Sequence, residues 1–297
     1  MVRIRTFMRE WPVAWFVALT FLATYGIGLP WALLSGDFEE AMGLREGFLS
    51  LMIMRYSPTI AGLAIVAAVA GKSGLQVWLV QLLRWRVSFS YYLAVVGFVA
   101  FPFLVSLAAT FTLDELATSP DLAASRNWLE IVWLYLEEIF YIPLTNGEET
   151  GWRFALLGLL LPRMKPLFAM FIIGVIWSVW HMPAFFLFEQ SAEWYPLVII
   201  CMAWGVLYGW IYLRTGSLLL PVLAHGLSNA TFYAFERLFP SLNAHWEAIG
   251  ATEDWFFAAG GTVIAIAVIL VDRVYLMTYY NPPVAEDWVS KSPRPAI

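Results

Sequence analysis

The chain has 297 residues, of which 61% are hydrophobic and only 13% charged, and its net charge is −5. Soluble domains average about 25% charged residues, so this composition excludes an ordinary soluble protein and predicts an all-α, polytopic membrane protein. One cysteine, Cys201, excludes both an intrachain disulfide and a cysteine-based zinc cluster. Nothing in the sequence points to a nucleic-acid partner.

Apolar runs of about 20 residues, long enough to cross a hydrocarbon core as a helix, recur along the chain. We predict eight transmembrane helices, at residues 11–34, 48–70, 91–111, 139–161, 167–188, 195–213, 217–238 and 255–277. The first follows three arginines, but its length and the lack of a cleavage site make it a signal anchor rather than a signal peptide. The chain divides into residues 1–127, 128–238 and 239–297.

The charged loops are distributed asymmetrically about these predicted helices. Most lysines and arginines fall on one side, whereas Glu39, Glu40, Asp114 and Glu115 fall on the other. Loops rich in lysine and arginine stay in the cytoplasm. We therefore expect both termini to be cytoplasmic in a multi-pass protein of the cell membrane.

A short amphipathic helix is predicted between the second and third spans. Residues 75–86 carry apolar side chains at helical spacing and end in two arginines, a pattern typical of a helix on a membrane surface. The apolar positions are Leu75, Trp78, Leu79, Leu82 and Leu83. Membrane lipid is the expected partner of this surface.

A first polar cluster, NGEETGWR at residues 146–153, interrupts the fourth predicted span. On a helix, Glu149 and Arg153 are four residues apart and can form a buried ion pair. Glu148 points about 100° away from that pair, and a carboxylate in an apolar setting suits a general base near neutral pH. We assign Glu148 to chemistry and Glu149–Arg153 to support, the alternative being that both glutamates only join helices.

Two further clusters contain two of the three histidines in the chain, His181 and His225, at comparable depths. Asn229 lies four residues after His225, so it shares that helix face and can present an amide donor beside the imidazole. A lone histidine in a helix is usually a core group, but ionisable groups in hydrocarbon cost about 2.5–3.5 kcal/mol each and rarely persist without a role. His245 is placed in an external loop and is expected to be incidental.

The strings EETGWR, WSVWHMP and YLRTGSLLLPVLAHGLSN resemble the three signatures of the CPBP family. This family comprises CAAX-prenyl endopeptidases and bacteriocin-processing or self-immunity membrane proteins, also called Abi proteins. The family pattern has three parts. Glu-Glu-x-x-x-Arg falls on Glu148, Glu149 and Arg153, and His-x-x-x-Asn or Asp falls on His225 and Asn229. Phe-x-x-x-His falls on Trp177 and His181, so that a tryptophan stands in place of the usual phenylalanine. The resemblance covers about residues 130–235 and makes 128–238 the predicted catalytic core.

The resemblance implies an intramembrane endopeptidase that cleaves a membrane-associated peptide or lipidated protein, a prenylated CAAX-type C-terminus being one option. It implies that Glu148 and His181 deprotonate the attacking water, and that His225 and Asn229 stabilise the oxyanion. Other intramembrane protease designs are disfavoured, because HExxH, Gly-x-Ser-x-Gly and Gly-x-Gly-Asp are absent. The residues expected to line the substrate pocket are Trp152 and Trp177.

The sequence leaves the role of a metal open. Glu148, His181 and His225 would make a zinc site of two histidines and one glutamate with an open water position. The same residues can also act without metal as a glutamate-type hydrolase, and we favour that version. Two other functions remain: a non-catalytic self-immunity or scaffold protein, and a proton-coupled transporter, which the lack of an internal repeat disfavours.

Overall fold

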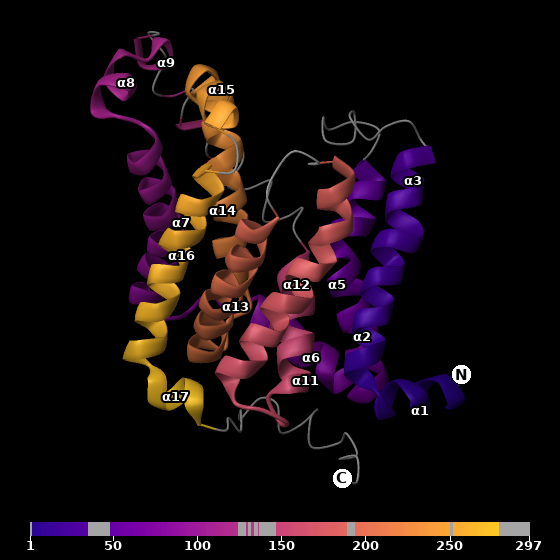
Figure 1. The fold of residues 1–297 in the computed structure, drawn as a ribbon. Helices are drawn as coiled ribbons and strands as arrows, with labels where there is room; N and C mark the ends of the chain where they lie inside the picture. The colour runs from indigo at the N-terminus through magenta and orange to yellow at the C-terminus, as the bar shows by residue number, and fades with distance from the viewer. Residues whose placement is uncertain are drawn as a thin grey trace.

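The computed structural model describes most of the chain: residues 2–34, 48–123, 147–188, 194–249 and 252–278, together with 129, 132, 133 and 136. Every element in this part of the chain is a helix (Figure 1). The first eight residues of the predicted span 139–161, the acidic residues Glu39 and Glu40, and the tail from residue 279 lie outside the described residues.

The N-terminal half starts with a short helix at one end of the bundle and then crosses it repeatedly. Its elements are α1 (Val2–Glu10), α2 (Pro12–Phe21), the π-helix η1 (Leu22–Gly28), α3 (Leu29–Leu34), α5 (Phe48–Val69), α6 (Gly71–Leu82), α7 (Phe89–Thr110), α8 (Leu113–Thr118) and α9 (Pro120–Ala123). The helices α2, η1 and α3 run on without a break and correspond to the first predicted span.

The C-terminal half carries all three polar clusters. Its elements are the π-helix η2 (Thr150–Leu156), α11 (Leu157–Leu160), α12 (Pro166–Phe188), α13 (Tyr195–Thr215), α14 (Leu219–Leu238), α15 (Pro240–Ile249), α16 (Thr252–Val271) and α17 (Arg273–Met277). His245, expected in a loop, lies in helix α15, where its ring is 5.4 Å from that of Phe111.

Five stretches of the described chain are long and apolar enough to cross a membrane, by length and composition: Pro12–Trp31, Phe89–Thr110, Pro166–Pro183, Tyr195–Thr215 and Asp254–Val271. A shorter apolar stretch, Ile53–Val69, lies in α5. The all-helical, polytopic membrane class predicted from composition is confirmed. The number of eight spans stays a prediction.

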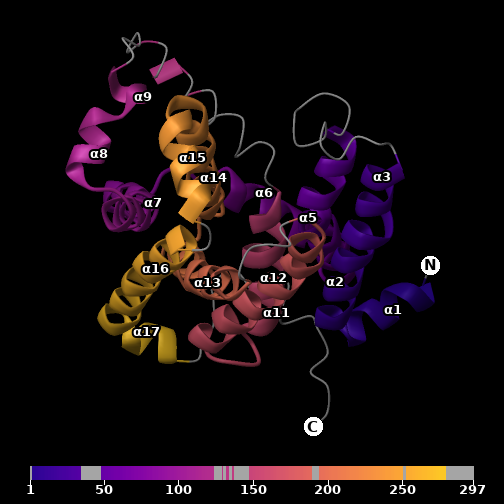
Figure 2. The ribbon, with the colours of Figure 1, turned by 45° about the horizontal axis from the view of Figure 1, so that its top comes forward.

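Helices α12 and α13 pack against each other in the middle of the bundle, with α2, α5 and η2 on one side and α7, α14 and α16 on the other (Figures 1 and 2). Glycines permit this close approach. A Cβ atom on Gly174 would lie 2.7 Å from the Cα of Met202, and one on Gly205 would lie 3.3 Å from the Cα of Gly174. Small residues are the usual means by which membrane helices bring their backbones together.

The predicted amphipathic helix is present as α6, but its apolar stripe is divided between two environments. Leu75, Trp78 and Leu82 pack against the protein core, whereas Leu79 and Leu83 are exposed. The end of α6 is fixed by Gln81, whose side chain accepts a hydrogen bond from the hydroxyl of Tyr212 at 2.6 Å. The helix is therefore both an exposed apolar surface and a structural part of the bundle.

The ends of the described chain lie at the same end of the bundle. Helices α1, α6 and α17 gather there, and α8, α9 and α15 lie at the opposite end (Figure 1). Arg9 ties α1 to the end of α5 by donating to the carbonyls of Ala68, at 2.8 Å, and Val69, at 3.3 Å. This arrangement agrees with the predicted charge asymmetry, in which the two ends of the chain share one side of the membrane.

We expect single cysteines introduced at residues 4 and 292 to react with a membrane-impermeant thiol reagent only after the cells are opened. One introduced at residue 118, on α8, should react in sealed cells, because loops rich in lysine and arginine stay inside. The native Cys201 is buried and gives little background. Labelling of residue 4 or 292 from outside would reverse the orientation.

Asp121 anchors α9 to the beginning of α15. Its buried carboxylate accepts hydrogen bonds from the backbone amides of Ser241, at 2.9 Å, and Leu242, at 3.0 Å. A carboxylate on the free amides of a helix N-terminus satisfies these donors and interacts favourably with the helix dipole.

We expect Asp121→Ala to lower the free energy of unfolding in detergent by about 1–2 kcal/mol. The exposed Asp114→Ala is the control, and an equal loss there would contradict this role.

Candidate active site

The glutamate pair lies at the start of the π-helix η2, where the chain is pressed against α5. A side chain on Gly151 would overlap the backbone of Pro58, and one on Gly147 would overlap the ring of Tyr56. The hydroxyl of Thr59 donates to the carbonyl of Gly147. Short π-helical turns occur frequently at functional sites, and here the two glycines fix the depth at which the glutamates enter the bundle.

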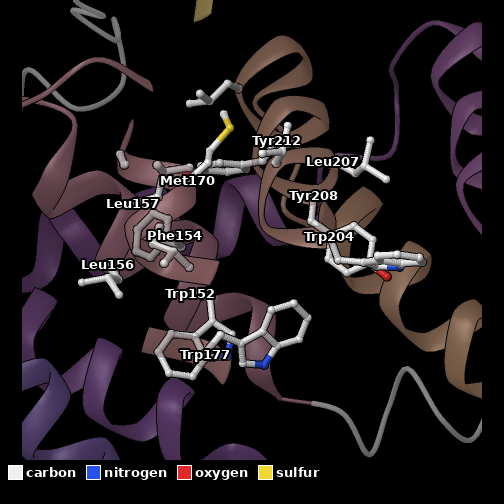
Figure 3. Packing of buried hydrophobic residues seen from close by; sticks show 14 of the residues in the cluster. Trp152, Phe154, Leu156, Leu157, Met170, Trp177, Trp204, Leu207, Tyr208 and Tyr212 are labelled. Atoms are coloured by element: carbon white, nitrogen blue, oxygen red, sulfur yellow. The ribbon is translucent and has the colours of Figure 1, made fainter. Parts of the chain in front are cut away.

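Glu148 is held by two tryptophan side chains from different helices. Its Oε2 atom accepts a hydrogen bond from Trp177 Nε1 at 2.6 Å and one from Trp152 Nε1 at 3.3 Å. The carboxylate is only 6% exposed, and the two indoles lie close together at one edge of the buried aromatic cluster (Figure 3). These two bonds hold the carboxylate between η2 and α12.

Glu149 joins two other site residues. Its Oε2 atom lies 2.8 Å from Arg153 Nε, which is the ion pair predicted from their spacing. Its Oε1 atom lies 2.8 Å from Nδ1 of His225 on α14. All three side chains are at least nine-tenths buried. Glu149 therefore orients an imidazole in addition to balancing the charge of the arginine.

Arg153 is enclosed by aromatic faces. Its guanidinium carbon is 5.1 Å from the centre of the Trp177 ring and 5.6 Å from that of Tyr208. The short contact to Glu149 lacks hydrogen-bond geometry, and the guanidinium nitrogens have no hydrogen-bond partner among the described residues. Charge attraction and cation–π contacts hold this side chain.

Each of the two site histidines is fixed through Nδ1. Nδ1 of His181 lies 2.9 Å from the backbone carbonyl of Trp177, one turn earlier on α12. Because a carbonyl oxygen can only accept, the proton sits on Nδ1 and Nε2 keeps its lone pair. His225 likewise uses Nδ1 for Glu149. In both imidazoles, therefore, the contact that fixes the ring uses Nδ1 and not Nε2.

Trp177 lies at the centre of these residues. Its ring centre is 5.7 Å from the imidazole of His181 and 5.4 Å from that of His225, while its indole N–H reaches Glu148. Sequence reasoning placed Trp177 and Trp152 on a pocket wall, and that role stays a prediction. What sequence reasoning missed is that both indoles hydrogen-bond the carboxylate.

The exposed fraction of the side chain differs among the signature residues. Glu149 and Arg153 are almost completely buried, whereas His181 and Asn229 are half-buried. Asn229 makes no hydrogen bond to another described residue and sits one turn beyond His225 on the same face of α14. The half-buried residues are therefore those with free polar atoms to offer a substrate.

Support for His181 also comes from the first span. The Trp180 ring packs edge-on against His181, with centres 4.7 Å apart, and its Nε1 donates to Thr24 in η1 at 2.9 Å. Thr24 in turn shares a 2.5 Å hydrogen bond with Ser57 of α5. Two polar residues in otherwise apolar spans were the sequence signal for this network, which sequence reasoning did not use.

The residues named as zinc ligands do not fit that role as they are arranged. In the part of the chain that the structure describes, no three His, Cys, Asp or Glu side chains are grouped as a metal ion requires. In addition, Glu148 Oε2 already accepts two indole hydrogen bonds. The chemistry of the site is therefore derived from its side chains alone.

Comparison with known proteins agrees with this geometry. Residues 126–231, which contain all six signature residues, match the family described as type II CAAX prenyl endopeptidase Rce1-like. This core is similar to proteins of the CAAX-protease family. The chain is also 24% identical over 183 residues to a protein named CAAX prenyl protease 2 from Methanococcus maripaludis, which covers 57% of this chain. It spans 60% of the length of that relative.

The matched segment contains the described helices η2, α11, α12, α13 and most of α14. It overlaps nearly all of the region that the three sequence signatures indicated. The helices before residue 126 and after residue 231 fall outside the match, although α5 and η1 contact the site through Thr59 and Thr24. The family core is thus positioned by helices that the match does not include.

Proposed function

We propose that this protein is an intramembrane endopeptidase in which Glu148 activates the attacking water. The observation that carries this proposal is a carboxylate 94% removed from solvent and oriented by two indole N–H groups. One of these indoles, that of Trp177, also lies 5.7 Å from the imidazole of His181. Similarity of residues 126–231 to the CAAX-protease family supports peptide hydrolysis as the reaction.

In the proposed reaction, a water molecule donates hydrogen bonds to the Glu148 carboxylate and to Nε2 of His181. Glu148 takes a proton as the water oxygen attacks the scissile carbonyl carbon, whose π electrons move onto the carbonyl oxygen. When the tetrahedral intermediate collapses, the C–N bond breaks and Glu148 returns the proton to the leaving amine. General acid–base catalysis of this kind contributes typically about 10²–10⁴-fold in rate.

The negative charge that develops on the carbonyl oxygen requires donors on the opposite side of the site. The amide of Asn229 is one such donor, and we assign the other to His225, which lies one turn away on the same helix. The contact of its Nδ1 with Glu149 fixes the orientation of this imidazole. Loss of one oxyanion donor typically costs about 2.7–4 kcal/mol in the transition state.

We propose that the substrate is a membrane-associated peptide segment, with a prenylated C-terminal peptide as the first candidate. Two observations support this choice: the name of the relative from Methanococcus maripaludis, CAAX prenyl protease 2, and the position of the site on η2, α12 and α14 within an apolar helical bundle. We further propose that both termini face the cytoplasm.

The direct test is to reconstitute the purified protein in liposomes with a farnesylated peptide and an unmodified membrane peptide, and to analyse the products by mass spectrometry. We expect a defined cleavage product from the wild type and none from Glu148→Ala at equal protein level and melting temperature. If the wild type cleaves neither peptide, the non-catalytic scaffold function gains support.

Trp177→Phe should separate the hydrogen bond on Glu148 from the packing of the aromatic ring. Phenylalanine keeps an aromatic ring but has no N–H donor. Hydrogen bonds to charged groups contribute about 1.5–3 kcal/mol, so we expect kcat to fall by roughly 10–100-fold with little change in KM. Trp204→Phe, a buried tryptophan stacked on Phe257, is the packing control. Equal effects of the two substitutions on kcat would contradict this role.

A further inference from the structure

Arg55 is a half-buried cation in α5 that forms no ion pair within the part of the chain that the structure describes. Its one hydrogen-bond partner there is the hydroxyl of Tyr233 on α14, to which its terminal nitrogen donates at 3.4 Å. Charged residues inside membrane helices are costly and usually mark substrate paths or binding sites. A long, weak hydrogen bond to a neutral hydroxyl leaves most of the bonding capacity of the guanidinium unused.

The position of this pair relative to the active site follows from two helices independently. On α5, Arg55 is one turn from Thr59, which holds the carbonyl of Gly147 next to Glu148. On α14, Tyr233 is one turn from Asn229. One turn corresponds to about 6 Å along a helix. Both helices therefore place the Arg55–Tyr233 pair about one turn from the catalytic residues, toward the end of the bundle that carries α15 (Figure 1).

The two helices belong to different sides of the bundle. Helix α5 packs mainly on α2, η1 and η2, whereas α14 packs on α7 and α13. The long side chains of Arg55 and Tyr233 reach across between them. The charged groups near Tyr233 on α14 are the exposed Glu236 and Arg237. Glu236, the anion of the two, forms no ion pair with Arg55.

We propose, on the basis of the endopeptidase function above, that Arg55 and Tyr233 bind the C-terminal carboxylate of the substrate peptide. The planar guanidinium matches a carboxylate with two parallel N–H···O bonds, and the tyrosine hydroxyl supplies a third donor. An extended peptide advances about 3.3–3.6 Å per residue. The Arg55–Tyr233 pair is about one helical turn from the catalytic residues, and the length of the arginine side chain adds to this distance. The C-terminal carboxylate of the peptide would therefore lie roughly two or three residues after the scissile bond.

The test compares two peptides that differ only at the C-terminus, both with a farnesylated cysteine followed by three aliphatic residues. One ends in a free carboxylate and the other in a carboxamide. Equilibrium binding is measured to Glu148→Gln protein in detergent, so that no cleavage intervenes. We expect the acid to bind about 10–100-fold more tightly than the amide, the range of a charge-assisted hydrogen-bond pair.

Arg55→Gln in the same background should remove this preference by weakening the binding of the free-acid peptide alone. Arg55→Lys should keep part of the preference, because lysine keeps the charge but lacks the two parallel N–H donors of the guanidinium. Arg237→Gln, which removes an exposed cation one turn further along α14, should leave the preference intact. Equal binding of the two peptides to the Arg55-containing protein would overturn the proposal. Loss of the preference in Arg237→Gln would overturn it as well, since it would indicate unspecific attraction.

This measurement separates the proposal from the catalytic function on which it rests. A carboxylate preference that depends on Arg55, together with no cleavage by the Glu148-containing protein, would support the proposed carboxylate site and contradict the proposed endopeptidase activity. Cleavage without any carboxylate preference would keep the endopeptidase and reject the binding site.

Discussion

Glu148→Gln should lower kcat by about 10³-fold or more, in the upper range for loss of a general base, with almost no change in the melting temperature. Glutamine has nearly the same shape, and its carbonyl oxygen can still accept the indole N–H groups of Trp177 and Trp152. It cannot take a proton from water. The measurements are the rate of peptide cleavage and the thermal unfolding of the same protein in the same detergent.

Glu149→Gln is the matched control for this substitution, because it makes the same chemical change at the adjacent residue. It leaves Arg153 buried without a negative partner and weakens the support of His225, so both melting temperature and activity should fall. If Glu148→Gln instead prevented folding and Glu149→Gln were harmless, the roles assigned to the two glutamates would be reversed.

Arg153→Met should lower the free energy of unfolding by about 3–5 kcal/mol, the range for removing one partner of a buried ion pair. Methionine fills part of the volume of the arginine but leaves the Glu149 carboxylate uncompensated at a site that is 1% exposed. It also removes the cation that lies over the rings of Trp177 and Tyr208. Thermal and denaturant unfolding in detergent measure the loss.

The double variant Glu149→Gln/Arg153→Met removes both charges and should recover much of this stability, since neutral residues leave no uncompensated charge. Its activity should nevertheless stay low, because His225 has lost the carboxylate that orients Nδ1. Stability losses that simply add in the double variant would show that the two residues are not coupled.

The sequence by itself determined the features that depend on neighbours within one helix. The Glu149–Arg153 pair follows from a spacing of four residues, and it is present at 2.8 Å. Composition and apolar run length determined the all-helical membrane class, because a hydrocarbon core accepts only segments that satisfy their own backbone. The three signature strings also identified the core that the family match contains.

Only the tertiary structure decided which side chains from different helices meet. Trp177 and Glu148 are 29 residues apart, and His225 and Glu149 are 76 apart; their contacts depend on how α12 and α14 cross η2. Gly147 and Gly151 likewise allow close packing of the glutamate segment onto α5, a contact that helical periodicity cannot reveal. For the same reason, the position of Arg55 one turn from the candidate active site depends on how α5 and α14 are placed in space.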